Sequence, residues 1–305
     1  MLLSNTLVYQ NQLQCANEEV ANKILEIPDI DGFRRRCHGI DASSLSSSSA
    51  KDPIPCAGGA SCWLETTLDA RRSVVFIDTD RIPAVEVRVG QSTQNPTEAL
   101  LVCQITEALI SGGIAESDIG IISVLRAQLR VLSRLLASRP SLDIHTVDRY
   151  QGKDKDCVIV SLVRSNAEQH VGELLKDWRR INVAFTRAKK KLIVIGSRKT
   201  LQGSEVFEQF LRLMERQDWV LRLGLAAHHL HPLLARPGLS LQQTTVDVKV
   251  EEGEEEEEDK ENIKVRVKKE EEAAAAVKQE PKVARASAES ILKRMPTVKA
   301  ILNSM

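Results

Sequence analysis

The sequence lacks several features that would point to particular protein classes. Aromatic residues make up only 3% of the 305 residues, and 42 basic side chains balance 42 acidic ones. The six cysteines include no C-x-x-C pair, which argues against a zinc cluster or a disulfide scaffold and favours a reducing compartment. No apolar run approaches the roughly 18 residues of a membrane span, and the first residues do not resemble a secretory signal. These absences predict a protein of the cytosol or nucleus with no membrane partner and no metal site.

Composition divides the chain into four regions. Residues 39–61 are rich in Ser, Pro and Gly, which predicts a disordered insertion. Residues 62–224 carry most of the apolar runs and are the predicted folded core, with residues 1–38 as its N-terminal part. Residues 225–305 contain the acidic run Glu251–Asp259 and alternating charge blocks, which predict a disordered tail. Because that acidic run balances the total, the folded part alone is basic.

Five short apolar runs lie within the predicted core, and helical patterns separate several of them. Most are nearly continuous in Val, Ile and Leu, as in strands covered on both faces. The runs are residues 73–79, 119–123, 144–148, 157–163 and 191–197. One intervening helix is marked by Asn95 as its cap, Pro96 at its first position and Glu98 in a capping box. This alternation predicts a three-layer α/β domain with a parallel sheet.

A polar turn, Asp148–Asp156, follows the predicted strand 144–148. In an open parallel sheet, ligands bind beyond the carboxyl ends of the strands, where this turn is expected to lie. Gly152 permits a tight turn or a close backbone approach to a phosphate. Taken alone, the same residues are more typical of a charged surface turn between two strands.

A second polar segment, residues 177–190, predicts an amphipathic helix ahead of the strand 191–197. At about 100° per residue, one face of this helix packs on the sheet; it consists of Trp178, Ile181, Phe185 and Ala188. Another face carries Arg180, Ala184 and Arg187. A guanidinium on a rigid helix can stabilise the charge of a transferring phosphoryl group. A solvated basic helix face is the alternative interpretation.

Together the two segments are far more specific than either alone. The stretches "HTVDRYQGKDKDCVIVSLVRSN" and "VGELLKDWRRINVAFTRAKKKLIVIGS" resemble motifs V and VI of superfamily 1 helicases of the Upf-like branch. The "VGELLKDWRR" joint is most similar to the eukaryotic DNA replication helicase/nucleases of that branch. The resemblance runs from residue 1 to about 218, apart from the Ser-rich insertion. It implies a RecA-like fold of the P-loop NTPase type, and within it the C-terminal lobe of the helicase.

The resemblance also implies roles for individual residues. Arg187 matches the motif VI arginine finger, a catalytic residue that reaches the ATP γ-phosphate. Gly152 and Asp154 match the motif V residues that approach the nucleotide, although Asp154 stands where many relatives carry the longer Glu.

Other matched positions are implied to contact the nucleic acid or to link it to ATP hydrolysis. Thr146 matches the motif V threonine that touches the DNA backbone. Gln151 and Arg180 match positions that couple the nucleotide cleft to the strand-binding face. Arg126 and Gln128 match a motif IV-like, DNA-binding segment, in which Val124-Leu125 replaces the usual Pro-Tyr.

The implied function is that of a motor lobe in an ATP-dependent DNA helicase/nuclease. Such an enzyme hydrolyses ATP with Mg²⁺ between two RecA-like lobes and acts on single-stranded DNA and flaps during Okazaki fragment processing and end resection. Partners would be single-stranded DNA, the first lobe, the nuclease domain and replication or repair proteins. The nucleus is the expected location, with the mitochondrion as a second one.

The sequence contains no G-x-x-x-x-G-K-[ST] phosphate loop, and the family's Walker B strand, nuclease carboxylates and iron–sulfur cysteines have no match. Because the first lobe holds Mg²⁺ and the phosphates, the chain is expected to be a fragment or truncated isoform that is not competent alone. No iron–sulfur cluster is expected. Two alternatives stay open: an RNA helicase of the same branch, and a non-catalytic module that binds nucleic acid or a partner.

The tail carries three tetrapeptides of the form ψ-K-x-E. They centre on Lys249, Lys268 and Lys278 and predict sites of SUMO attachment. A plain solvated spacer is the alternative, since Lys- and Glu-rich tracts generate such tetrapeptides easily.

Overall fold

The computed structural model describes residues 23–38, 56, 62–150 and 152–231. Its centre is a six-stranded sheet in the order β5-β4-β6-β7-β1-β8, and all neighbouring strands are parallel. The strands are β1 (Val74–Asp78), β4 (Ile119–Ser123), β5 (Asp143–Thr146), β6 (Lys155–Ser161), β7 (Ala188–Gly196) and β8 (Val220–Arg222). The predicted α/β fold with a parallel sheet is confirmed.

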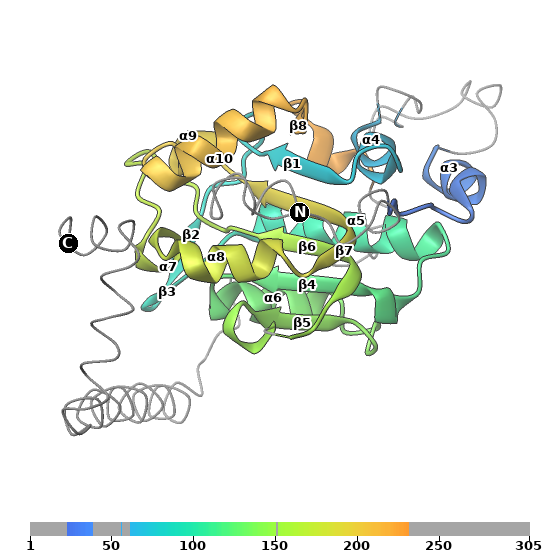
Figure 1. Ribbon diagram of the computed structural model, residues 1–305, viewed down its shortest axis with the longest axis horizontal. Coiled ribbons are helices and arrows are strands. Elements are labelled where there is room, and N and C mark those ends of the chain that lie inside the picture. Colours follow the sequence, from blue (N-terminus) through green and yellow to red (C-terminus); the bar gives the residue numbers. More distant parts are fainter. Residues whose placement is uncertain (1–22, 39–55, 57–61, 151, 232–305) are drawn as a thin grey trace, which may run out of the picture. The chain divides into compact units, whose positions relative to one another are not determined.

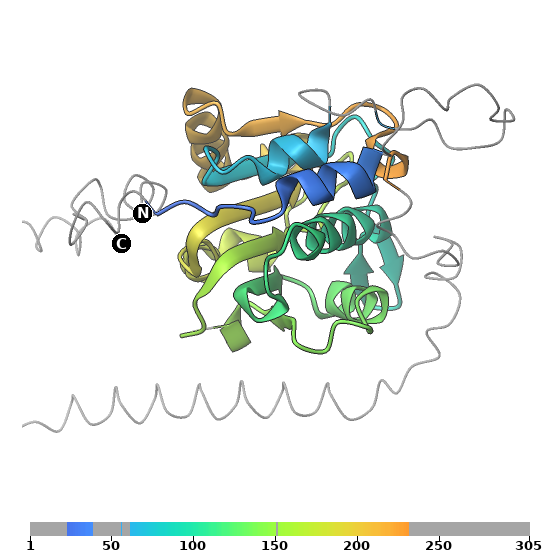
Figure 2. The ribbon, with the colours of Figure 1, turned by 90° about the vertical axis from the view of Figure 1, so that its right-hand side faces the viewer.

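Helices cover both faces of this sheet (Figures 1 and 2). On one face lie α3 (Ile30–His38), α4 (Trp63–Leu68), α5 (Pro96–Ser111), α6 (Arg126–Leu135) and the 3-10 turn η4 (Ala227–His229). On the other lie α7 (Glu173–Lys176), α8 (Trp178–Phe185), α9 (Arg198–Leu201) and α10 (Glu205–Arg216). Connecting elements are the antiparallel hairpin β2 (Val87–Val89) and β3 (Ser92–Gln94), and the 3-10 turns η2 (Glu116–Asp118) and η3 (Asp148–Tyr150).

The central strands are buried on both faces, which explains their continuous apolar sequences. In β6, Cys157 and Ile159 join the cluster under α5, whereas Val158 and Val160 join the cluster under α8 and α10. Each fully buried aliphatic side chain stabilises the fold by about 1.5–3 kcal/mol. The second cluster also contains stacked Phe185 and Phe210 rings, whose centroids are 5.2 Å apart.

Several predicted boundaries differ from the structure. The hairpin β2–β3 and strand β8 were not predicted, because strands of three residues carry too little pattern. The predicted tail boundary after residue 224 falls too early, because His228 and His231 are buried against the fold. Cys56, inside the predicted insertion 39–61, is buried too.

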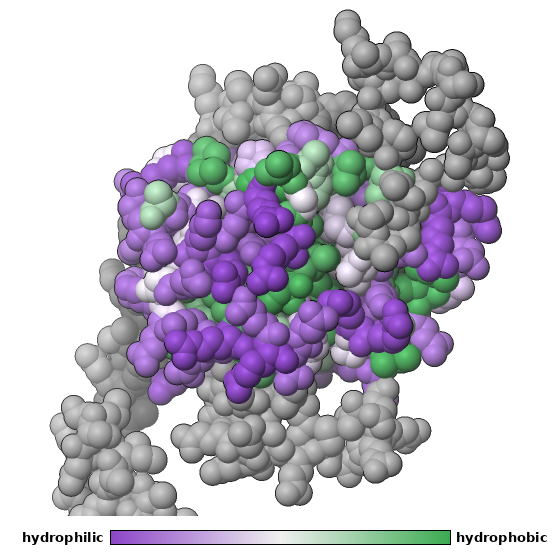
Figure 3. Space-filling model, turned by 90° about the horizontal axis from the view of Figure 1, so that it is seen from above, coloured by the Kyte–Doolittle hydropathy of each residue, from purple (hydrophilic) through white to green (hydrophobic). Residues whose placement is uncertain are grey.

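The rest of that insertion, the remainder of the tail and its three predicted SUMO lysines lie outside the described residues. Seen from the side of β8 and α10, the surface is mainly hydrophilic, with small separate hydrophobic patches (Figure 3). Within the described part of the chain, no helix has the length and apolar character needed to cross a membrane.

Candidate functional site

The strand pairing brings the two motif segments together at the amino edge of the sheet. Lys155 at the start of β6 pairs with Ala188 at the start of β7, so the preceding residues, Asp154 and Arg187, lie side by side. The Arg187 Nη1 atom lies 2.9 Å from Asp154 Oδ1, in an ion pair. The backbone agrees, since the Lys155 N–H donates to the Arg187 carbonyl at 3.0 Å.

Two further contacts hold the Arg187 guanidinium. Its Nε donates to the Val183 carbonyl at 3.1 Å, and its Nη2 donates to the Thr186 hydroxyl at 3.1 Å. The side chain is 21% exposed, so the guanidinium is oriented by the protein but still meets solvent. Its remaining N–H groups can donate to an anion without breaking these bonds.

Arg187 lies just beyond helix α8, which corrects the prediction that it projects from the helix. The helix ends at Phe185, Thr186 is its C-cap, and β7 begins at Ala188. The predicted helix face is wrong at Ala184 as well, because Ala184 is buried in the core rather than turned away from it. The mount of Arg187 is therefore a two-residue turn fixed by a helix end on one side and a strand start on the other.

A second contact ties α8 to the motif V turn. Arg180 Nε lies 3.4 Å from Asp148 Oδ1 and 3.6 Å from Asp177 Oδ2. Asp177 also caps α8 by accepting from the Arg179 N–H at 3.1 Å. The turn and the helix are thus linked at both ends, through Arg180 at one and Arg187 at the other.

Acidic and basic side chains alternate along the amino edge. Lys190 pairs with Asp156 at 2.7 Å, and Lys155 pairs with Asp143 at 2.5 Å. The hydrogen bond from Lys155 lowers the pKa of Asp143, against the effect of its partial burial. Arg180, Arg187 and Lys190 of the basic run each have an acidic partner within 4 Å.

Gly152 lies inside the same turn with φ of +82°, a conformation that side chains other than Gly rarely adopt. An added Cβ there would meet no atom within 4 Å, so space beside the backbone is open. The turn geometry alone requires Gly, and the open space leaves room for a ligand. Gln151, the predicted coupling residue next to it, lies outside the described residues.

The predicted DNA contacts lie at the opposite edge of the sheet. Thr146 ends β5 and pairs with Ser123 at the end of β4, while the exposed Arg126 begins α6 just after β4. Gln128 belongs to neither surface because it is fully buried. The expectation that the turn Asp148–Asp156 lies beyond the carboxyl ends of the strands is therefore wrong for its last residues: motif V starts at the carboxyl edge with Thr146 and crosses to the amino edge by Asp154.

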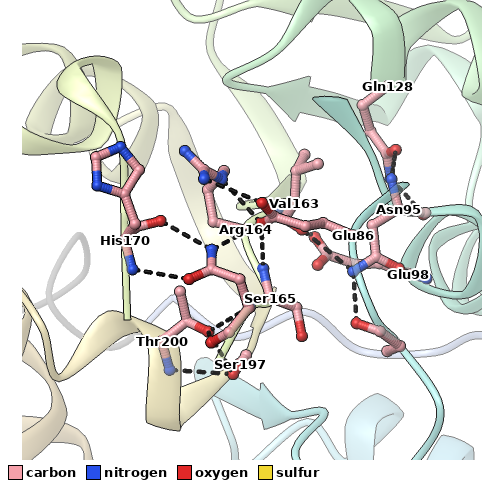
Figure 4. Close-up of polar contacts among 12 residues, drawn as sticks. Glu86, Asn95, Glu98, Gln128, Val163, Arg164, Ser165, His170, Ser197 and Thr200 are labelled. Carbon is pink, nitrogen blue, oxygen red and sulfur yellow. Dashed lines mark hydrogen bonds and ion pairs between the residues drawn. The ribbon is translucent and has the colours of Figure 1, made fainter. Parts of the chain in front are cut away.

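A buried polar network at the carboxyl edge was not predicted as a site (Figure 4). Glu98 Oε1 accepts from the Ser161 hydroxyl at 2.7 Å and from the Val163 N–H at 2.9 Å. Burial raises the pKa of Glu98 to about 7, although both hydrogen bonds act to lower it. Val163 has φ of +70°, a strained value for a β-branched residue, and the Asn95 amide also holds its carbonyl at 3.1 Å.

Only half of the predicted capping box forms. Asn95 caps α5 by accepting from the Glu98 N–H at 2.9 Å. The Asn95 N–H donates to Gln128 Oε1, at 2.8 Å, instead of to the Glu98 side chain. Glu98 is thereby released to bind β6 and the loop that follows it.

The "VRSN" loop after β6 completes this network (Figure 4). Glu86 accepts two bonds from Arg164, at 2.9 and 3.0 Å, and one from the Ser165 N–H at 2.7 Å. Burial acts to raise the pKa of Glu86, but Arg164, Asn166 and Ser165 together lower it. Glu86 thus holds the loop at the carboxyl edge at several points, and the sequence of the loop alone did not indicate this partner.

Comparison with known proteins agrees with this geometry. A family model described as an AAA domain matches residues 1–199. The DNA replication ATP-dependent helicase/nuclease of Schizosaccharomyces pombe is 38% identical over 222 residues, which are 73% of this chain and 15% of that protein. The Mus musculus enzyme is 41% identical over 204 residues, 66% and 18% of the two chains. The Homo sapiens enzyme is 36% identical over 229 residues, 75% and 20%.

The chain belongs to the AAA domain family. Its motifs and parallel sheet resemble those of a superfamily 1 helicase lobe, and over most of its length it is similar to part of the DNA replication ATP-dependent helicase/nucleases. The chain spans only about a fifth or less of the length of these relatives.

Proposed function

We propose that this chain is the ATPase motor lobe of a DNA helicase/nuclease that acts on single-stranded DNA and flaps in replication and repair. The observation that carries the proposal is the Arg187–Asp154 pair, in which a guanidinium is fixed beside a strand start with N–H groups to spare. A fixed guanidinium at the surface of one lobe suits a contact to phosphate held by another.

This lobe supplies only part of the contacts that ATP and Mg²⁺ need. Arg187 and the open backbone at Gly152 offer contacts to a nucleotide, but the sequence has no phosphate loop to hold its phosphates. The chain's own share of the reaction is to stabilise negative charge through Arg187 and to position that side chain through Asp154. Binding of Mg²⁺ and of the β- and γ-phosphates is left to a second lobe.

The two edges of the sheet suggest how ATP and DNA are coupled. Motif V runs from Thr146 at the carboxyl edge to Asp154 at the amino edge, and Arg180 holds its middle to α8. A shift at the nucleotide edge would therefore move the DNA edge, which supports alternating grip on the DNA backbone. Phosphate contacts by a hydroxyl such as that of Thr146 position a strand without reading its sequence.

The test is ATP hydrolysis in a chimera, in which this chain replaces the matching segment of the Schizosaccharomyces pombe relative. Arg187→Ala should lower DNA-stimulated turnover by roughly 10³-fold or more, with DNA affinity largely kept. Arg187→Lys should also be impaired, because Lys lacks the planar fork. Arg179→Ala is the matched control, since Arg179 is an exposed arginine of the same helix.

Near-normal turnover in the Arg187→Ala chimera would contradict the proposal, as would a chimera without DNA-stimulated hydrolysis. Stimulation by single-stranded RNA rather than DNA would favour an RNA helicase. The chain by itself should hydrolyse no ATP.

A further inference from the structure

Two cysteines and a histidine from distant parts of the chain meet on the face of the sheet that α3, α4 and α5 cover. Cys37 lies in the last turn of α3, Cys62 caps α4, and His231 follows η4. The Cys37 sulfur lies 2.9 Å from His231 Nδ1, and the Cys62 sulfur lies 3.6 Å from His231 Nε2. One imidazole is therefore flanked by two thiols.

The spacing of these atoms matches that of a metal site. One ligand atom from each residue can be chosen so that all lie within 4.8 Å of one another. In tetrahedral zinc sites, bonds of about 2.3 Å to sulfur and about 2.0 Å to nitrogen place ligand atoms about 3.5–3.8 Å apart. Small side-chain rotations would suffice to bring the three groups to one ion. Cys62 and His231 are only 0% and 2% exposed, so an ion there would be shielded from water.

The two thiols and the imidazole supply three of the four ligands that structural zinc sites use.

Neighbouring contacts hold His231 at this place. The Trp63 ring packs edge-on against the His231 ring, with centroids 5.9 Å apart. Trp63 Nε1 also donates to the Ala227 carbonyl at 3.0 Å, and Gln104 Nε2 donates to the His228 carbonyl at 3.0 Å. Contacts with α4 and α5 therefore hold residues 227–231 in place. They position the imidazole beside both sulfurs before any ion binds.

We propose that Cys37, Cys62 and His231 bind one Zn²⁺ ion. Thiolates and imidazole are ligands that suit zinc, and the burial of Cys62 and His231 favours a structural role. The ion ties α3 and residues 225–231 to α4. The cysteine spacing predicted no metal site, because the ligands become neighbours only in the folded chain. None of them belongs to the proposed nucleotide or DNA contacts, so the site is independent of that function.

The first test is the metal content of the full chain, purified without an affinity metal. Elemental analysis should find about one zinc per chain. Replacement by Co²⁺ should give the absorption bands of tetrahedral thiolate coordination. A chain with no bound zinc and no such cobalt spectrum would overturn the proposal, as would a Cys37–Cys62 disulfide found in its place.

Variants then identify the ligands. Cys37→Ser, Cys62→Ser and His231→Ala should each lose most of the zinc and melt at a lower temperature. Cys157→Ala is the matched control, because Cys157 is a buried cysteine of β6 outside the cluster, and it should retain the full zinc content.

Equal zinc content in the control and in all three ligand variants would overturn the site. The cobalt spectrum of the unaltered chain decides the question even if a variant fails to fold.

Discussion

Glu98 makes the stability of this fold depend on pH in a predictable direction. Its side chain is fully buried, and burial raises its pKa from 4.5 to about 7. Between these two values the folded chain binds a proton that the unfolded chain has released. The contribution of Glu98 is therefore fully present below about pH 4.5 and is lost as the pH rises through 7. A shift of this size corresponds to about 3 kcal/mol.

The replacement Glu98→Gln should remove this dependence. Gln keeps an oxygen that can accept from the Ser161 hydroxyl and the Val163 N–H, and it cannot ionise. Its amide nitrogen would take the place of Glu98 Oε2, which has no hydrogen-bond partner among the described residues. We expect the variant to match the parent chain near pH 5 and to exceed its free energy of unfolding by up to about 3 kcal/mol at pH 8.

Urea unfolding at several pH values between 5 and 8 measures the effect as the difference between the two chains. Glu208→Gln is the control, because it makes the same chemical change on a half-exposed side chain of α10. If the curves of the parent chain and Glu98→Gln run parallel across this range, the assigned ionisation of Glu98 is refuted.

Two further predictions concern the strands and the DNA edge. Gly120→Ala should lower the free energy of unfolding by about 1–3 kcal/mol in urea melts, because the new Cβ would overlap the Tyr150 hydroxyl. Adding Tyr150→Phe should restore part of this loss. If the double variant is no more stable than Gly120→Ala, the assigned contact is contradicted. Thr146→Val should weaken binding of single-stranded DNA by the chimera by about fivefold, roughly 1 kcal/mol, and equally for all sequences, because a phosphate contact carries no sequence information. A fluorescence anisotropy titration with homopolymeric and mixed DNA measures this loss, and a sequence-dependent loss would refute the assigned contact.

The sheet was predictable because its signals are local. Each of the five predicted runs overlaps a strand. In β1, β4, β6 and β7, burial leaves a nearly continuous apolar sequence that can be read directly, whereas the edge strand β5 is only half-buried. The end of α8 was not predictable from periodicity, because the pairing of Ala188 with Lys155 draws the chain into β7 three residues after Phe185. A helical pattern continued through Arg187, but a sheet contact decided its conformation.

The buried polar groups could not be predicted for a related reason. Glu98 contacts residues 63 and 65 positions away, and Cys37 contacts His231 across 194 positions. Such contacts depend on which helices share a face of the sheet, and no local spacing encodes them. The motif residues were recognised because they lie in continuous stretches of sequence. Their placement on two edges of the sheet could be seen only once the strand order was known.

The contribution of Arg187 to the transition state can be measured most directly by nucleotide binding. In the chimera, the affinities for ADP with aluminium fluoride, which mimics the transferring phosphoryl group, and for ADP alone should be compared. Arg187→Ala should weaken binding of the aluminium fluoride complex by at least about 100-fold and leave ADP binding nearly unchanged, whereas Arg179→Ala should alter neither. Equal affinity of the parent and Arg187→Ala chimeras for the aluminium fluoride complex would contradict the motor-lobe account.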